Sequence, residues 1–280
     1  MNSSDKLKMA LTAVIVAVLA YYGVAKSRTA PPPAPVPSPS KQAAASDLAG
    51  GKEKDTRILG EFDLARLYPE SVLRQGNPGR KVVALTFDDG PDNQYTPQVL
   101  DILAQKGVKA TFFLIGKRLA EAPSVVKRIM NDGHDVGNHT FNHPNISHFS
   151  HQDVEREVRT ADEELRRFGV EAGGMFRPPY GAVAPDSIEP LARSGYRLYL
   201  WSVDSLDWRG LNRDQIVGNV IPQVTSGSVI LFHSAGGPGE DLTGTVQALP
   251  IIIDDLRAKG FTFATLHEMF QAKPRPARQG

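Results

Sequence analysis

The stretch KVVALTFDDGPDN, residues 81–93, decides the fold, because an apolar run ends there in two adjacent carboxylates and a turn. Such a run is typical of a buried strand in a parallel sheet. Asp88 and Asp89 fit two interpretations: turn residues before a Gly-Pro pair, or functional groups at a strand end. Because consecutive strand side chains point to opposite faces, both carboxylates reach one site only if the strand breaks at the Gly-Pro pair.

The same pattern repeats along the chain, as short apolar runs separated by amphipathic helical segments. The expected strands are residues 81–87, 110–115, 134–139, 174–179, 196–203, 227–233 and 261–266. The expected helices are residues 96–107, 122–133, 151–169, 186–195, 212–224 and 245–260, several of which end in glycine. This alternation predicts an α/β fold with a parallel sheet covered by helices. About seven such units fit either a barrel or an open doubly wound sheet.

Reactive side chains follow five of the expected strands. Parallel strands gather their carboxyl ends on one face, so we expect these side chains to converge. They are Asp88 and Asp89 after the first strand, His139 and His143 after the third, Arg177 after the fourth, Asp204, Asp207 and Trp208 after the fifth, and His233 at the end of the sixth.

The spacing of His139 and His143 suggests a metal site. Four residues apart, they would lie on one side of a helical turn and bind one ion. Two imidazoles and one carboxylate make an open metal site, with positions left for water and substrate. We expect the neighbouring His134, His148 and His151 to line a loop or to lie on a helix surface.

The remaining polar residues suggest acid-base chemistry. The carboxylate that does not bind the metal would accept a proton from water, with Arg177 as its partner; a surface arginine is the alternative. His233 follows the apolar run SVILF and is either a core histidine or a general acid. A hydrogen bond from Asp207 would fix its tautomer and raise its pKa.

The segments TFDDGP, HTFNH, RPPYG, DSLDW and LFH, taken in order, resemble the five motifs of the NodB-type polysaccharide deacetylases, carbohydrate esterase family 4. The resemblance covers residues 81–266, within an expected catalytic domain of residues 57–280. It implies an irregular (β/α) barrel and one divalent metal ion. Zinc is the expected metal, and Co²⁺, Ni²⁺ or Fe²⁺ also suit the ligands.

The resemblance also implies a role for each motif residue. Asp89, His139 and His143 would bind the metal, and Asp88 would be the general base, oriented by Arg177. The backbone N–H of Tyr180 would stabilise the oxyanion, and His233, tuned by Asp207, would be the general acid. Trp208, Leu231 and Pro178 would bind the substrate, with Trp208 and Leu231 forming the apolar pocket for the acetyl methyl group.

The implied activity is hydrolysis of N-acetyl groups on amino sugars, with N-acetylglucosamine of peptidoglycan as the expected substrate. Chitin-like oligomers and an exported polysaccharide are alternatives. A glycosidase would use paired carboxylates but no histidine pair or metal. A serine hydrolase is disfavoured, because the sequence has no G-x-S-x-G motif. An inactive glycan-binding module is the alternative from another class.

The N-terminus predicts export. Residues 9–25 form an uncharged apolar stretch between Lys8 and Lys26, and we expect an uncleaved signal anchor with one transmembrane helix within residues 1–28. A cleaved signal peptide, which would give a secreted protein, is the alternative. Residues 29–56 are rich in Pro, Ala and Ser and predict an extended linker. We therefore expect a single-pass membrane protein with its catalytic domain outside the cytoplasm.

The composition limits the kinds of molecule that we expect this protein to bind. The chain of 280 residues is 41% hydrophobic with a formal net charge of +1, which argues against nucleic acid as a partner. It has no cysteine, so disulfides, thiolate ligands and thiolate nucleophiles are excluded. We expect an N-acetylated polysaccharide as the partner and a monomeric catalytic domain.

Overall fold

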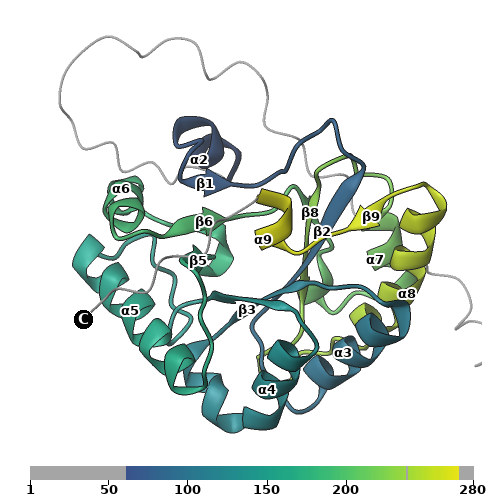
Figure 1. The fold of residues 1–280 in the computed structure, drawn as a ribbon, viewed down its shortest axis with the longest axis horizontal. Coiled ribbons are helices and arrows are strands. Elements are labelled where there is room, and N and C mark those ends of the chain that lie inside the picture. Colours follow the sequence, from purple (N-terminus) through teal and green to yellow (C-terminus); the bar gives the residue numbers. More distant parts are fainter. Residues whose placement is uncertain (1–60, 238, 271–280) are drawn as a thin grey trace, which may run out of the picture. The chain divides into compact units, whose positions relative to one another are not determined.

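The computed structural model describes residues 61–237 and 239–270, an α/β domain in which most helices lie around the outside of a curved sheet (Figure 1). Its strands are β1 (Val72–Leu73), β2 (Val82–Asp88), β3 (Thr111–Leu114), β4 (Asp135–Asn138), β5 (Met175–Phe176), β6 (Arg197–Tyr199), β7 (Val203–Asp204), β8 (Val229–His233) and β9 (Thr262–Phe263). Its α-helices are α2 (Glu61–Leu67), α3 (Tyr95–Lys106), α4 (Pro123–Asn131), α5 (His151–Arg167), α6 (Pro185–Arg193), α7 (Arg213–Val220), α8 (Thr243–Ala258) and α9 (Leu266–Phe270). Three short 3-10 helices are η1 (Gly116–Glu121), η2 (Pro179–Gly181) and η3 (Asp207–Arg209).

The sheet has nine strands in the described residues and forms a parallel half-barrel. Its order is β1-β6-β5-β4-β3-β2-β8-β7, and β9 pairs with β2 off this path. Every pairing between these strands is parallel. The expected parallel α/β fold is therefore confirmed.

Each expected strand and helix overlaps an observed strand or helix, but the expected strand at residues 196–203 is divided into two strands. Its first part forms β6 beside β5, and its last residue opens β7 beside β8, far along the sheet order. Only residues 200–202 separate the two strands in sequence, although five strands lie between them in the sheet order. The chain therefore passes directly from one side of the open half-barrel to the other. This division, together with the short strand β1, corrects the expected count of about seven strands.

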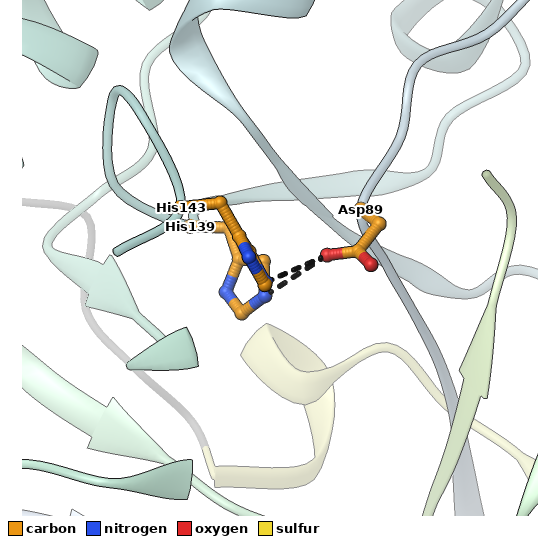
Figure 2. A group of neighbouring side chains, drawn as sticks. All are labelled: Asp89, His139 and His143. Atoms are coloured by element: carbon orange, nitrogen blue, oxygen red, sulfur yellow. Dashed lines mark ion pairs between the residues drawn. The ribbon is translucent and has the colours of Figure 1, made fainter. Parts of the chain in front are cut away.

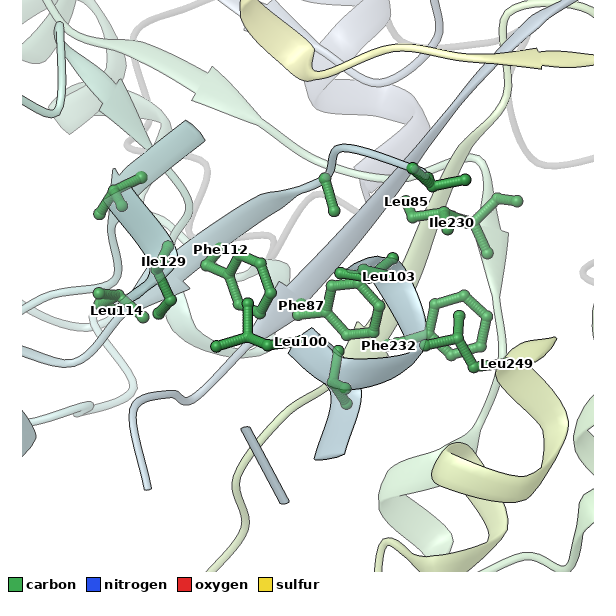
Figure 3. Packing of buried hydrophobic residues seen from close by; sticks show 14 of the residues in the cluster. Leu85, Phe87, Leu100, Leu103, Phe112, Leu114, Ile129, Ile230, Phe232 and Leu249 are labelled. Carbon is green, nitrogen blue, oxygen red and sulfur yellow. The ribbon is translucent and has the colours of Figure 1, made fainter. Parts of the chain in front are cut away.

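Two apolar clusters pack against the sheet. Val83, Leu85 and Phe87 of β2 belong to the cluster that packs with α3, α4, α7 and α8, called here the helix-side core, whereas Ala84 belongs to a second cluster that includes residues of α5 and α6. The helix-side core includes a stacked row of aromatic rings. The centre of the Phe87 ring lies 5.2 Å from that of Phe112 and 5.6 Å from that of Phe232 in β8 (Figure 3). This alternation follows the period of two residues in a strand. Even-numbered residues of β2 therefore face the inside of the half-barrel.

The predicted membrane segment and linker, residues 1–28 and 29–56, lie outside the described residues. Among residues 61–237 and 239–270, no helix combines the length and the apolar character needed to cross a membrane.

Candidate metal centre and active site

The site begins at the carboxyl ends of β2 and β8, whose last residues are neighbours. Asp88 is the register partner of His233. Each side chain follows a phenylalanine of the helix-side core, Phe87 or Phe232, and alternation turns it to the opposite face. Asp88 and His233 therefore both face the inside of the half-barrel.

Asp89 departs from strand geometry and brings a second carboxylate to the same place. Its φ of 69° lies in the left-handed region, and β2 ends at the residue before it. Oδ2 of Asp88 lies 3.7 Å from Nε2 of His139, and Oδ1 of Asp89 lies 3.4 Å from the same atom. The strand therefore breaks where the sequence required it for both carboxylates to reach one site.

His139 and His143 lie on the loop that follows β4 and face the Asp89 carboxylate from one side (Figure 2). Nε2 of His143 is 3.1 Å from Oδ1 of Asp89. The expected helical turn is wrong, because Thr140 and His143 have φ values of 65° and 62°. Instead, the backbone N–H of His143 donates to Oγ1 of Thr140 at 3.0 Å and closes a tight loop.

The three side chains fit a divalent cation. Asp89, His139 and His143 each offer one ligand atom, and these atoms lie within 4.8 Å of one another. Nδ1 of His139 donates to the carbonyl of Arg177 at 2.7 Å, which leaves the Nε2 lone pair directed at the group. Oδ1 of Asp89 is buried and finds no well-oriented hydrogen-bond donor among the described residues. Two imidazoles and one carboxylate form an open donor set of the kind that zinc prefers.

The charge of Asp89 suits this role. Burial alone would raise its pKa, but the hydrogen-bonding distance and charge of the imidazoles of His139 and His143 outweigh burial. Together they hold the pKa of Asp89 well below its usual range, so the carboxylate is ionised.

Arg177 is buried beside Asp88, which excludes the alternative of a surface arginine. Its side chain is fully buried, and Nη1 donates to Oδ1 of Asp88 at 2.7 Å and to Oγ1 of Thr86 at 2.9 Å. Nε donates to the carbonyl of Tyr199 at 2.7 Å, and the guanidinium lies 4.2 Å from the centre of the Phe113 ring. These contacts fix the orientation of Asp88 and leave its Oδ2 facing the histidines.

His233 and Asp207 form the second pair of the site. Nδ1 of His233 lies 2.7 Å from Oδ1 of Asp207, whose Oδ2 accepts from the His233 backbone N–H and from Thr245 Oγ1, each at 2.9 Å. Burial lowers the pKa of His233, but the charge and hydrogen bond of Asp207 outweigh it and raise the pKa to about 10. Asp204 plays a different part, since its Oδ1 accepts from the backbone N–H of Leu206 at 2.8 Å.

Of the residues expected at the substrate, Tyr180 contacts the metal cluster, and the other three are close in sequence to residues of the site. Tyr180, with φ of 61°, places its ring 5.0 Å from that of His143 and is 65% exposed. Trp208 follows Asp207 and is 50% exposed. Leu231 lies two residues before the end of β8, on the same face of the strand as its last residue, and is buried, as is Pro178.

Residues 75–199 match the family described as "Polysaccharide deacetylase". The chain is 44% identical over 189 residues to a peptidoglycan-N-acetylglucosamine deacetylase of Bacillus cereus, covering 68% of each chain. It is 39% identical over 208 residues to a chitooligosaccharide deacetylase of Sinorhizobium fredii, covering 71% of this chain and 96% of the relative.

The chain belongs to the polysaccharide deacetylase family. The deacetylase fold is also similar to solved structures. The peptidoglycan N-acetylglucosamine deacetylase Bc1960 matches with a TM-score of 0.72 and 39% identity, covering 75% of this chain and 98% of that one. A wild-type CE4 family pseudoenzyme of Bacillus anthracis matches with a TM-score of 0.66 and 26% identity, covering 73% and 70%. This fold is therefore shared by a deacetylase and by a pseudoenzyme.

Several residues that support the deacetylase site were not predicted from the sequence. Thr86 stands two residues before Asp88, so the period of a strand was a usable signal for its place on the same face. Thr245 comes from α8 and Arg118 from η1, and neither has a local sequence signal. Nη1 of Arg118 donates to the carbonyl of Asp89 at 2.7 Å.

The other histidines correct one expectation. His148 and His151 are exposed, as expected for a loop and a helix surface. His134 is buried instead, because its Nδ1 accepts from the backbone N–H of Ala110 at 3.1 Å and its ring packs edge-on against Phe112.

Proposed function

We propose that this deacetylase removes acetyl groups from N-acetylglucosamine residues of peptidoglycan with the help of one divalent metal ion, most suitably Zn²⁺. The observation that carries the proposal is the arrangement of two buried pairs, Asp88 with Arg177 and His233 with Asp207, beside the cluster of Asp89, His139 and His143. The similarity to peptidoglycan deacetylases over most of the chain supports the substrate.

Asp89, His139 and His143 would hold the ion. A divalent cation bound there supplies Lewis acidity toward the acetamide carbonyl and lowers the pKa of a nearby water molecule.

Asp88 is placed to act as the general base. Its Oδ1 is occupied by Arg177, so Oδ2 is the oxygen that accepts the proton of the attacking water. The water oxygen adds to the acetamide carbon, and the backbone N–H of Tyr180 donates to the carbonyl oxygen as its charge develops. Arg177 keeps the carboxylate in place during this transfer.

His233 is placed to act as the general acid. It carries a proton at neutral pH, because its pKa is raised to about 10 through Asp207. Since Nδ1 is held by Asp207, Nε2 is the atom that donates to the sugar nitrogen as the C–N bond breaks. Acetate and a free amino sugar are the products. Trp208, Leu231 and Pro178 provide the apolar contacts for the acetyl methyl group and the sugar.

An acetate-release assay tests this proposal. Metal-loaded protein is incubated with peptidoglycan fragments, chitin oligomers and an acetylated exported polysaccharide, and both acetate and glycan length are measured. We expect acetate from peptidoglycan with no cleavage of the glycan chain. Acetate mainly from chitin oligomers would move the substrate to the alternative class, which the S. fredii relative represents. No acetate from any glycan, with metal bound, would favour an inactive glycan-binding module.

We also propose that residues 1–28 anchor the chain in the cell membrane, with a monomeric catalytic domain outside the cytoplasm. The support is the apolar stretch of residues 9–25 and the proline-rich stretch after it. Carbonate extraction of membranes should leave the full-length protein in the pellet. A soluble protein whose N-terminus begins after residue 25 would show cleavage, and light scattering of the domain would detect a dimer.

A further inference from the structure

The loop between the two histidines is held by a carboxylate of a neighbouring helix. Glu157 of α5 directs both carboxylate oxygens at this loop. Its Oε2 accepts from the backbone N–H groups of Phe141 and Asn142, at 3.1 and 2.9 Å. Its Oε1 accepts from Nδ2 of Asn142 at 2.9 Å. One side chain therefore binds two of the three residues that lie between His139 and His143.

A second carboxylate of α5 holds the start of the loop. Oδ1 of Asp162 accepts from Nδ2 of Asn138 at 2.7 Å, and its Oδ2 accepts from the hydroxyl of Tyr196 at 2.5 Å. Oδ1 of Asn138 in turn accepts from the backbone N–H of Thr140 at 2.8 Å. Asp162 and Asn138 are both buried. The residues on either side of His139 are thus joined through Asn138 to α5.

We propose that Glu157 and Asp162 are positioning residues, which arrange His139 and His143 for the metal before it binds. The inference rests on the proposed metal site and deepens it. Neither carboxylate belongs to the Asp-His-His cluster, because their oxygens are occupied by the loop, Asn138 and a tyrosine hydroxyl.

The backbone of the loop explains why such support is needed. Thr140 and His143 both have left-handed φ values, a conformation that costs free energy in residues other than glycine and persists only where the surrounding structure holds it. The carbonyl groups of Thr140 and Phe141 accept from the backbone of η1, each at 3.0 Å. The N–H groups of Phe141 and Asn142 depend on Glu157 instead. Without its carboxylate the loop would lose its acceptors on one side and sample other conformations.

Residues that orient metal ligands typically change metal affinity by about 10- to 100-fold when they are replaced. Glu157→Gln keeps the size of the side chain but puts an amide N–H₂ group where one oxygen accepts a hydrogen bond. Asp162→Asn does the same at the start of the loop. The matched control is Glu155→Gln, because Glu155 is exposed on the same helix and makes no hydrogen bond with the described loop.

The test is the Zn²⁺ dissociation constant of the full-length protein, measured by competition with a chromophoric chelator. Thermal unfolding of the metal-free protein is measured in parallel, to establish that each variant is folded. We expect the constant to rise at least tenfold in Glu157→Gln and in Asp162→Asn, and to stay unchanged in Glu155→Gln. A purely structural role would lower the unfolding temperature and leave the Zn²⁺ constant of the folded protein unchanged.

The outcomes separate this inference from the proposed function. If the wild type binds Zn²⁺ and both variants bind it equally well, the positioning role is wrong and the metal site stands. If one variant does not fold, the other decides by the same criterion. If the wild type itself binds no Zn²⁺, the proposed metal site fails, and the positioning role fails with it.

Discussion

Replacement of Asp207 by asparagine is the sharpest perturbation of the acid-base chemistry. The Asp207 carboxylate, hydrogen-bonded to Nδ1 of His233, is the main reason that the pKa of this imidazole is raised to about 10 from its ordinary 6.5. That difference corresponds to about 5 kcal/mol in favour of the protonated ring. In Asp207→Asn the charge is lost while burial, which lowers the pKa of His233, remains. The pKa of His233 therefore falls.

The pH profile of kcat/KM for acetate release measures this change. His233 acts while protonated, so activity on the alkaline side ends where the ring loses its proton. We expect this limb to move to lower pH by more than about one unit in Asp207→Asn. A bound cation also lowers the pKa of His233. This effect is the same in the wild type and in Asp207→Asn when the two proteins contain equal amounts of metal.

Thr245→Val provides the control for this experiment. It removes a hydrogen bond to Oδ2 of Asp207 and keeps the negative charge, so its alkaline limb should move less. Superimposable profiles for the wild type and Asp207→Asn, with equal kcat/KM, would show that Asp207 does not set the pKa of His233 and would remove the pair from the mechanism.

Two further predictions concern stability. Arg177→Met leaves the buried carboxylate of Asp88 without its partner, so the free energy of unfolding should fall by about 3–5 kcal/mol in chemical denaturation; a loss below about 1 kcal/mol would contradict a buried ion pair. His134 is neutral in the folded protein, because burial lowers its pKa to about 4, so the unfolded chain binds more protons as pH falls from 6.5 to 4. Stability should drop by roughly 2–3 kcal/mol over that window in the wild type and by less in His134→Asn, which keeps an acceptor for the Ala110 N–H; equal drops in both proteins would rule out His134 as the cause.

Strand ends were predictable from the sequence, because apolar runs and helix-ending glycines mark the alternation of strands and helices. β8 ends at the predicted residue and β2 ends one residue later than predicted, and their register makes Asp88 and His233 neighbours. The parallel arrangement then required convergence of residues that lie far apart in the sequence. The division of residues 196–203 into β6 and β7 was not predictable, since the point where a curved sheet fails to close depends on all of its strands.

Loop geometry and contacts between distant elements were beyond the sequence. The spacing of His139 and His143 suggested a helical turn. Two left-handed residues and contacts from α5 instead form a loop that also brings the two imidazoles together. In the sequence, Glu157 is one of several charged residues on an amphipathic helix. Nothing local distinguishes it from Glu155, because its role depends on which face of α5 meets the loop.

We propose that the Asp-His-His cluster holds the metal on which deacetylation depends. The most direct test is a titration of metal-free protein with Zn²⁺, in which acetate release from peptidoglycan is followed against equivalents of metal added. We expect no release without metal and a linear rise that ends at one equivalent, with no rise in Asp89→Ala. Acetate release that is unchanged after metal removal, or full restoration in Asp89→Ala, would contradict it.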